Sequence, residues 1–194
     1  MALVSTFELL LKSQLPKLGS AADNLSRNIL QGYFLTIANV NFFEVTVSIV
    51  ITFKFPIDPV NPTAQPQTLK DLLDAVDISG QNIISVNSLT PEVAPNKARL
   101  TFTLPSNSTG LLLIQPNILD EVLLNALNFE ARGYVEVFLS SLSGSDTATL
   151  LLTPEHRGTF FKDINGKNLD ERGLDQIAYA LPVSNGGVFR LSNA

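Results

Sequence analysis

The chain has no cysteine, no tryptophan and only one histidine among its 194 residues. The absence of cysteine excludes disulfides, zinc–thiolate sites, iron–sulfur clusters and thiol nucleophiles. One histidine, His156, cannot form a zinc site of the usual type without cysteine ligands. A chain of this length buries enough surface to fold without a metal or a disulfide, and we expect no cofactor.

Charge is also scarce. Charged residues make up 16% of the chain, whereas a typical soluble domain has about 25%. The net charge is −5 and the basic residues are scattered singly, so we expect no nucleic-acid partner. A surface with so little charge is poorly protected against association, which favours coverage of part of it by other subunits.

The chain also lacks a long apolar run. No uncharged segment approaches the roughly 20 residues of a membrane-spanning helix, so we expect no membrane insertion. The apolar residues 1–15 include Glu8 and Lys12 and have no basic leader, unlike a secretory signal. These features predict a cytoplasmic location and leave export by a non-classical route open.

The clearest structural signal lies between Phe43 and Phe55, where every odd position is apolar. The even positions are polar apart from Val50, which is the alternation of a strand with one buried face. Thirteen residues exceed the usual strand length of about five to six. A bend, a bulge or pairing between subunits is therefore expected to accommodate the excess.

Two other local patterns predict elements. Ser5 and Glu8 have the spacing of a capping box before a leucine-rich stretch, so residues 1–31 are expected to be a helical segment that docks on its own or a neighbouring subunit. Tyr134–Leu139 and Thr147–Leu152 flank a Ser-Gly-Ser-Asp turn and predict a β-hairpin.

Short apolar runs separated by turn residues continue through the rest of the chain. They predict a mainly β fold: an antiparallel sandwich or open barrel of about nine strands with two or three short helices. At this length residues 1–194 are expected to form a single domain.

The densest group of functional side chains is Glu155, His156 and Arg157, between Pro154 and Gly158. In one interpretation His156 is a general base or a pH switch oriented by a carboxylate. In the other, which we favour, the segment is a polar turn shaped by the proline and the glycine. No Gly-x-Ser-x-Gly motif nominates a nucleophile, so the sequence predicts no catalytic residue and no enzyme.

A second group surrounds Gly166 and offers oxygen ligands at alternating positions, as a calcium loop requires. Its candidate ligands are Asp163, Asn165, Asn168, Asp170 and Glu171. The glycine is fourth from the first aspartate instead of sixth, and Lys167 lies inside the loop, so calcium is a weak candidate.

The sequence favours a non-enzymatic, self-assembling β-sandwich subunit that forms a homo-oligomer or a filament, because charge is sparse and both the long strand and the leucine-rich N-terminus need partners. The candidate interface residues are Phe7, Leu10, Leu11, Phe43, Val45 and Phe53. The first alternative is a sensor or transducer module that binds a small ligand or a protein through loops 56–67 and 153–173. The second alternative is a hydrolase that uses His156.

Overall fold

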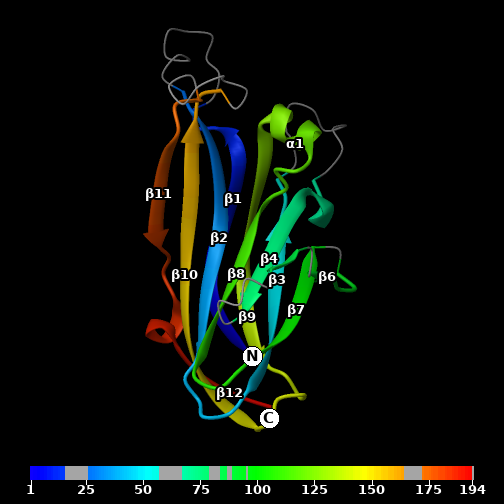
Figure 1. Cartoon of the computed structure of the whole chain (residues 1–194). Coiled ribbons are helices and arrows are strands. Elements are labelled where there is room, and N and C mark those ends of the chain that lie inside the picture. The colour runs from blue at the N-terminus through cyan, green and yellow to red at the C-terminus, as the bar shows by residue number, and fades with distance from the viewer. Residues whose placement is uncertain are drawn as a thin grey trace.

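The computed structural model describes residues 1–15, 26–56, 67–78, 84–86, 89–94, 96–163 and 172–193. It confirms the predicted fold class: the chain is mainly antiparallel β with very little helix, in one curled sheet (Figure 1). The described residues contain twelve strands, more than the nine expected, and one of them lies in the N-terminal segment for which a helix was predicted.

The strands in chain order are β1 (Ala2–Ser13), β2 (Asn28–Asn39), β3 (Val45–Lys54), β4 (Leu72–Ile78), β5 (Ile84–Val86), β6 (Thr90–Pro91), β7 (Lys97–Leu104), β8 (Ser108–Pro116), β9 (Asn128–Leu139), β10 (Thr147–Phe161), β11 (Asp175–Ala180) and β12 (Val188–Ser192). Within the described ranges the helical elements are α1 (Glu121–Ala126) and two short 3-10 turns, Leu69–Asp71 and Ser184–Gly187.

The course of β2 determines the architecture. One edge of β2 pairs with β10 from Asn28 to Asn39. The other edge is divided: its first residues pair with β1, and Tyr33–Asn39 pair with β8. Because β1 leaves β2 at this fork, the sheet continues in two directions, through β9, β3, β7 and β6 on one side and through β8, β4 and β5 on the other.

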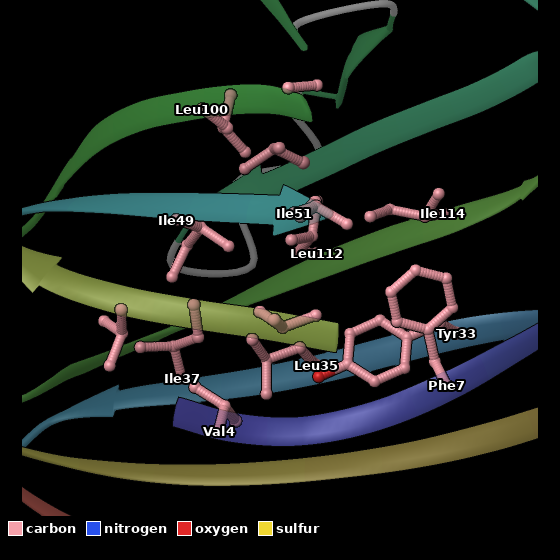
Figure 2. Packing of buried hydrophobic residues seen from close by; sticks show 14 of the residues in the cluster. Val4, Phe7, Tyr33, Leu35, Ile37, Ile49, Ile51, Leu100, Leu112 and Ile114 are labelled. Atoms are coloured by element: carbon pink, nitrogen blue, oxygen red, sulfur yellow. The ribbon is translucent and has the colours of Figure 1, made fainter. Parts of the chain in front are cut away.

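The two arms of the sheet enclose the hydrophobic core. Figure 2 shows Ile49 and Ile51 of β3 and Leu100 of β7 near Leu112 of β8, with Leu35 of β2 close by. All but Leu100 are fully buried, and Leu100 is 6% exposed. Burial of this apolar surface, at about 25 cal/mol per Å², is the main stabilising contribution to the fold.

The alternation between Phe43 and Phe55 is confirmed as strand β3, but the strand is ten residues long and pairs with β7 and β9 on its two sides. It lies inside the sheet and needs no pairing between subunits. Its second face is also covered, because Thr46 and Ser48 are buried and bond to the hydroxyls of Thr103 and Thr101, both at 2.8 Å.

The predicted N-terminal helix is wrong for the residues that the structure describes. Ala2–Ser13 form strand β1, which pairs with β9 along its length and with β2 at its end. Val4, Phe7 and Leu9 are buried against the core. A capping signal contributes only about 1 kcal/mol, and tertiary pairing on both sides outweighs it. Residues 16–25 of the predicted segment lie outside the described ranges.

The predicted hairpin is also wrong. β9 pairs with β1 and β3, whereas β10 pairs with β2, β11 and β12. The Ser-Gly-Ser-Asp turn therefore connects β9, in one arm of the sheet, to β10, which pairs with the undivided edge of β2. In Figure 1 this turn lies at the lower end of the molecule, near both termini.

Candidate functional site

His156 lies in the middle of β10, opposite Tyr33 of β2 and Tyr179 of β11. The predicted polar turn is therefore wrong, since Thr153–Phe161 belong to a continuous strand. His156 is only 4% exposed, in a line of buried residues that includes Leu150 and Leu152. The strand alternation carries its side chain to the inner face of the sheet.

Both ring nitrogens of His156 are occupied. The backbone N–H of Glu8 donates to Nε2 at 3.1 Å, and Nδ1 lies 3.0 Å from the hydroxyl of Tyr179. That hydroxyl donates to Oε1 of Gln31 at 3.1 Å, and Nε2 of Gln31 donates to the carbonyl oxygen of Glu8 at 2.9 Å. The four residues come from β10, β1, β11 and β2 and close a ring of hydrogen bonds, which we call the His156 ring.

The fork in the sheet explains why this ring is present. Leu10↔Gln31 is the last pair that joins β1 to β2, so the peptide groups of Glu8 have no backbone partner on β2. A buried N–H or C=O without a partner costs about 1–3 kcal/mol. His156 satisfies the N–H of Glu8 and Gln31 satisfies its C=O, which replaces the missing ladder bonds where the strands separate.

Burial of individual groups in the ring changes their acidity, most clearly at His156, which is 4% exposed. Burial lowers the pKa of His156 from its ordinary value of 6.5, while the nearby carboxylate of Glu8 acts in the opposite direction. Burial likewise raises the pKa of Tyr179, with a smaller contribution from Glu8. At neutral pH the ring therefore contains a neutral imidazole and a neutral phenol.

The neighbours of His156 in sequence lie on the opposite face of β10. Arg157 pairs with Glu155, and its guanidinium lies 4.4 Å from the centroid of the Phe34 ring. The carboxylate of Glu155 is therefore not one that orients His156. The groups that bond to His156 are the backbone N–H of Glu8 and the hydroxyl of Tyr179. They could not be found from the sequence because no local pattern links these positions to β10.

A shallow hollow of about 490 Å³ lies on this outer face, lined by residues that include Phe34, Gln115, Arg157 and Gln176. It exists because Gly32 carries no side chain there. A Cβ on Gly32 would approach the Cβ of Gln115 to 3.1 Å. The predicted binding residues are thus divided, with Arg157 in the hollow and His156 in the ring on the inner face.

The His156 ring offers no obvious route to hydrolysis. A general base needs a nitrogen lone pair directed at a substrate or a nucleophile. Here Nε2 already accepts from a backbone N–H, and Nδ1 faces a phenol. The ring joins four strands, which is a positioning role within the fold.

The calcium hypothesis falls largely outside the described residues. Asp163 follows β10, but Asn165, Asn168, Asp170 and Glu171 are in the part of the chain that the structure does not describe. In the described ranges no three histidine, aspartate or glutamate side chains gather as a metal site would require.

Most of the predicted interface residues belong to the chain's own core. The prediction is wrong for the four that are at most 5% exposed, which are Phe7, Leu11, Val45 and Phe53. Leu10 is half-buried and Phe43 is 38% exposed. Large apolar side chains that are more exposed occur in turns, in α1 and around β11: Phe42, Leu119, Val122, Leu142, Leu174, Ile177 and Tyr179.

No family model and no curated protein matches the chain. A solved structure described as "AvmM Catalyzes Macrocyclization in Alchivemycin A Biosynthesis" is aligned over 98% of this chain and 89% of that chain. The sequence identity is 9% and the TM-score is 0.22, which is too low to support a shared fold or a shared activity. No helix in the described ranges is long and apolar enough to cross a membrane.

Proposed function

We propose that this chain is a structural, self-assembling subunit, and that it associates with a second copy through the edge strand β11. The observation that carries the proposal is the unpaired outer edge of β11 within the described residues. β11 pairs with β10 on one side, and in the described part of the chain no strand pairs with its other side. All six of its residues are exposed.

This edge lacks the usual protection against pairing. Natural edge strands are commonly blunted by lysine, proline or a bulge. β11 has the sequence Asp-Gln-Ile-Ala-Tyr-Ala, in which Asp175 is the only charged residue. Ile177 and Tyr179 are 42% and 43% exposed, and the preceding Leu174 is 50% exposed. Such an edge is a template for addition of another strand.

A second copy of β11 is the occupant that fits best. Antiparallel pairing about a two-fold axis satisfies both edges at once with the same surface on each subunit. The N–H of Leu181 donates to the carbonyl oxygen of Pro154, so the odd-numbered residues of β11 bond to β10 and the even-numbered ones present their backbone groups at the outer edge. Directly opposed residues in an antiparallel pair have the same parity, so in the register centred on Ala178, Ile177 of one copy lies opposite Tyr179 of the other. Asp175 then lies opposite Leu181, so the two carboxylates are at opposite ends of the shared ladder and do not repel each other.

Pairing through β11 alone gives a closed dimer. Growth into a larger oligomer or a filament requires a second contact. The exposed apolar residues at the two ends of the molecule supply candidates, with Leu119 and Val122 at α1 and Phe42 and Leu142 in turns at the other end. Figure 1 places α1 at one end and the β2–β3 and β9–β10 turns at the other.

The test is sedimentation of the wild-type chain and two matched variants over a wide range of concentrations. Ile177→Lys places a cation on the edge, where the two-fold axis brings it close to its own copy. Leu151→Lys changes a residue of equal exposure, 42%, on β10, whose two edges are both paired. We expect wild type and Leu151→Lys to associate and Ile177→Lys to remain monomeric. A wild-type chain that is monomeric at the highest concentrations refutes the proposal.

The hollow around Arg157 favours a second candidate, a module that binds a small ligand. It differs from the predicted recognition surface, because residues 153–161 form β10 and residues 57–66 and 164–171 lie outside the described ranges. A compound that raises the melting temperature of the wild type but not of Arg157→Ala would support this candidate.

A further inference from the structure

The donors and acceptors of the His156 ring allow only one arrangement of protons. The backbone N–H of Glu8 can only donate, so Nε2 of His156 must carry a lone pair. The amide oxygen of Gln31 can only accept, so the hydroxyl of Tyr179 donates to it. The oxygen of Tyr179 is then free to accept from Nδ1–H of His156, at 3.0 Å.

A second proton on His156 breaks this arrangement. Protonated Nε2 would place an N–H against the N–H of Glu8, so the two groups would have to separate. The separation removes the contact between β1 and β10 at the fork, where no ladder bond replaces it. Because Nδ1–H moves with the displaced imidazole, the hydroxyl of Tyr179 loses the donor that orders it, which weakens its bond to Gln31 and so the inner-face attachment of β11 to β2.

We propose that the His156 ring is an acid-sensitive latch, in which protonation of His156 separates it from Glu8 and loosens β11. The consequence for assembly rests on the proposed function, because β11 is the strand that we propose to pair with a second copy. A loosened edge strand is a poor template, so acid is expected to dissociate the assembly.

The groups around His156 support this response. On β1 the carboxylate of Glu8 bonds to Arg132 of β9 at 2.8 Å, so its charge is partly neutralised. On β2 the buried phenol of Tyr33 bonds to Ser5 at 2.9 Å and stays neutral. On β11 Tyr179 is also a neutral phenol. The carboxylate near His156 is therefore that of Glu8, which is partly exposed and paired with Arg132.

The remaining charges of β10 do not face the imidazole. Glu155 and Arg157 pair with each other on the outer face. Because burial outweighs the Glu8 carboxylate, the pKa of His156 is lowered in the closed state. The stability of the latch is therefore fully present above about pH 6.5, the pKa of a solvent-exposed histidine. It is lost as the pH falls through the lower pKa that His156 has in the closed state.

The experiment is amide hydrogen exchange of β11 and β1, measured at about pH 7.5 and about pH 5.0 on dilute, monomeric protein and corrected for the intrinsic exchange rate. The opening constant is the ratio of molecules in which the bond between His156 and Glu8 is broken to those in which it is formed. For each pH unit below the pKa of His156 in the open state, this constant rises about tenfold, until the closed state also binds the proton. We expect β11 protection in the wild type to fall at the lower pH, by up to about thirtyfold, the limit set by the interval from about pH 6.5 to about pH 5.0.

Two variants separate the latch from a general effect of acid. His156→Gln keeps an acceptor for the N–H of Glu8 but cannot titrate, so its β11 protection is expected to be the same at both pH values. Tyr179→Phe keeps the contact between His156 and Glu8 but removes the bond from β11 to Gln31, so at about pH 7.5 β11 is expected to exchange faster than in the wild type while β1 remains protected. Equal wild-type protection at both pH values, or an equal fall in His156→Gln, overturns the latch.

Sedimentation of concentrated protein at the same two pH values distinguishes this proposal from the proposed function. Acid loss of β11 protection with no change in mass supports the latch and counts against assembly through β11. Association at both pH values with constant β11 protection refutes the latch and leaves the proposed function standing. Acid dissociation that His156→Gln abolishes supports both.

Discussion

Gly133 provides a sharp test of the packing at the centre of the sheet. It lies in β9, opposite Phe7 of β1 on one side and Phe53 of β3 on the other. A Cβ at this position would lie 1.9 Å from the carbonyl oxygen of Thr52 and 2.6 Å from Cζ of Phe7. Both distances are far below van der Waals contact, so Gly133→Ala requires the neighbours to move.

Neither neighbour can move easily. Thr52 belongs to β3, which has a strand on each side, so shifting its carbonyl oxygen breaks flanking ladder bonds that contribute about 1 kcal/mol each. The ring of Phe7 is held by the ring of Phe53, with centroids 5.5 Å apart, and displacing packed core atoms costs about 1–3 kcal/mol. We expect Gly133→Ala to reduce the free energy of unfolding by at least about 3 kcal/mol.

The assay is urea denaturation followed by far-ultraviolet circular dichroism. With an m-value of about 2 kcal/mol/M, the midpoint is expected to fall by about 1.5 M. Gly144→Ala is the matched control, because a Cβ at Gly144 in the β9–β10 turn meets nothing within 4 Å. Its free energy of unfolding is expected to match that of the wild type to within about 0.5 kcal/mol. Equal midpoints for the two variants would refute the packing described for β9.

Two further predictions concern buried polar groups. The amide nitrogen of Asn39 donates to three backbone carbonyls, those of Phe43, Leu104 and Pro105. Asn39→Ala is therefore expected to reduce the free energy of unfolding by about 3–5 kcal/mol in the same urea assay. The control is Asn125→Ala at an exposed position, which should reduce it by less than about 1 kcal/mol. Burial raises the pKa of the Tyr33 phenol above its ordinary value of 10.0, so stability is fully present below about pH 10 and is lost as the pH rises toward the folded pKa. The phenolate absorbance of Tyr33 is the difference between the wild type and Tyr33→Phe. In an alkaline titration this absorbance is therefore expected to appear only as the protein unfolds.

The best sequence prediction was the alternation that became β3. It succeeded because one face of this strand packs entirely into the core, so each odd residue from Val45 to Phe53 is buried. The polar residues between them suggested an exposed face, yet Thr46 and Ser48 are buried by hydroxyl pairs with β7. Threonine and serine are compatible with either environment, so residue type alone could not indicate the second covered face.

The N-terminal strand shows where local signals fail. The Ser5 and Glu8 spacing is a valid capping pattern, but in the structure Ser5 bonds to Tyr33 and Glu8 pairs with Arg132. Each of these partners is distant in sequence. The leucines that indicated a helix are equally suitable for a strand, and the choice depends on β9 and β2, which a local pattern does not contain.

The site could be predicted only as a single residue. His156 was a candidate general base or pH switch, but the favoured interpretation was a polar turn, and its neighbours Glu155 and Arg157 were grouped with it by sequence proximity. Alternation along β10 separates them onto opposite faces. The true partners are 148 residues away at Glu8 and 23 residues away at Tyr179, so only the strand order brings them together.

The latch and the edge strand are linked through the same element. β11 is attached to the molecule by its ladder with β10 and by the bond from Tyr179 to Gln31. If a second copy binds β11 only in its attached form, binding and protonation of His156 oppose each other through one equilibrium. Linkage then requires reciprocity. If protonation of His156 weakens association tenfold, association must lower the apparent pKa of His156 by one unit. A titration of His156 in monomer and assembly would therefore give the same coupling free energy as sedimentation across pH, and unequal values would show that other groups contribute to the acid response.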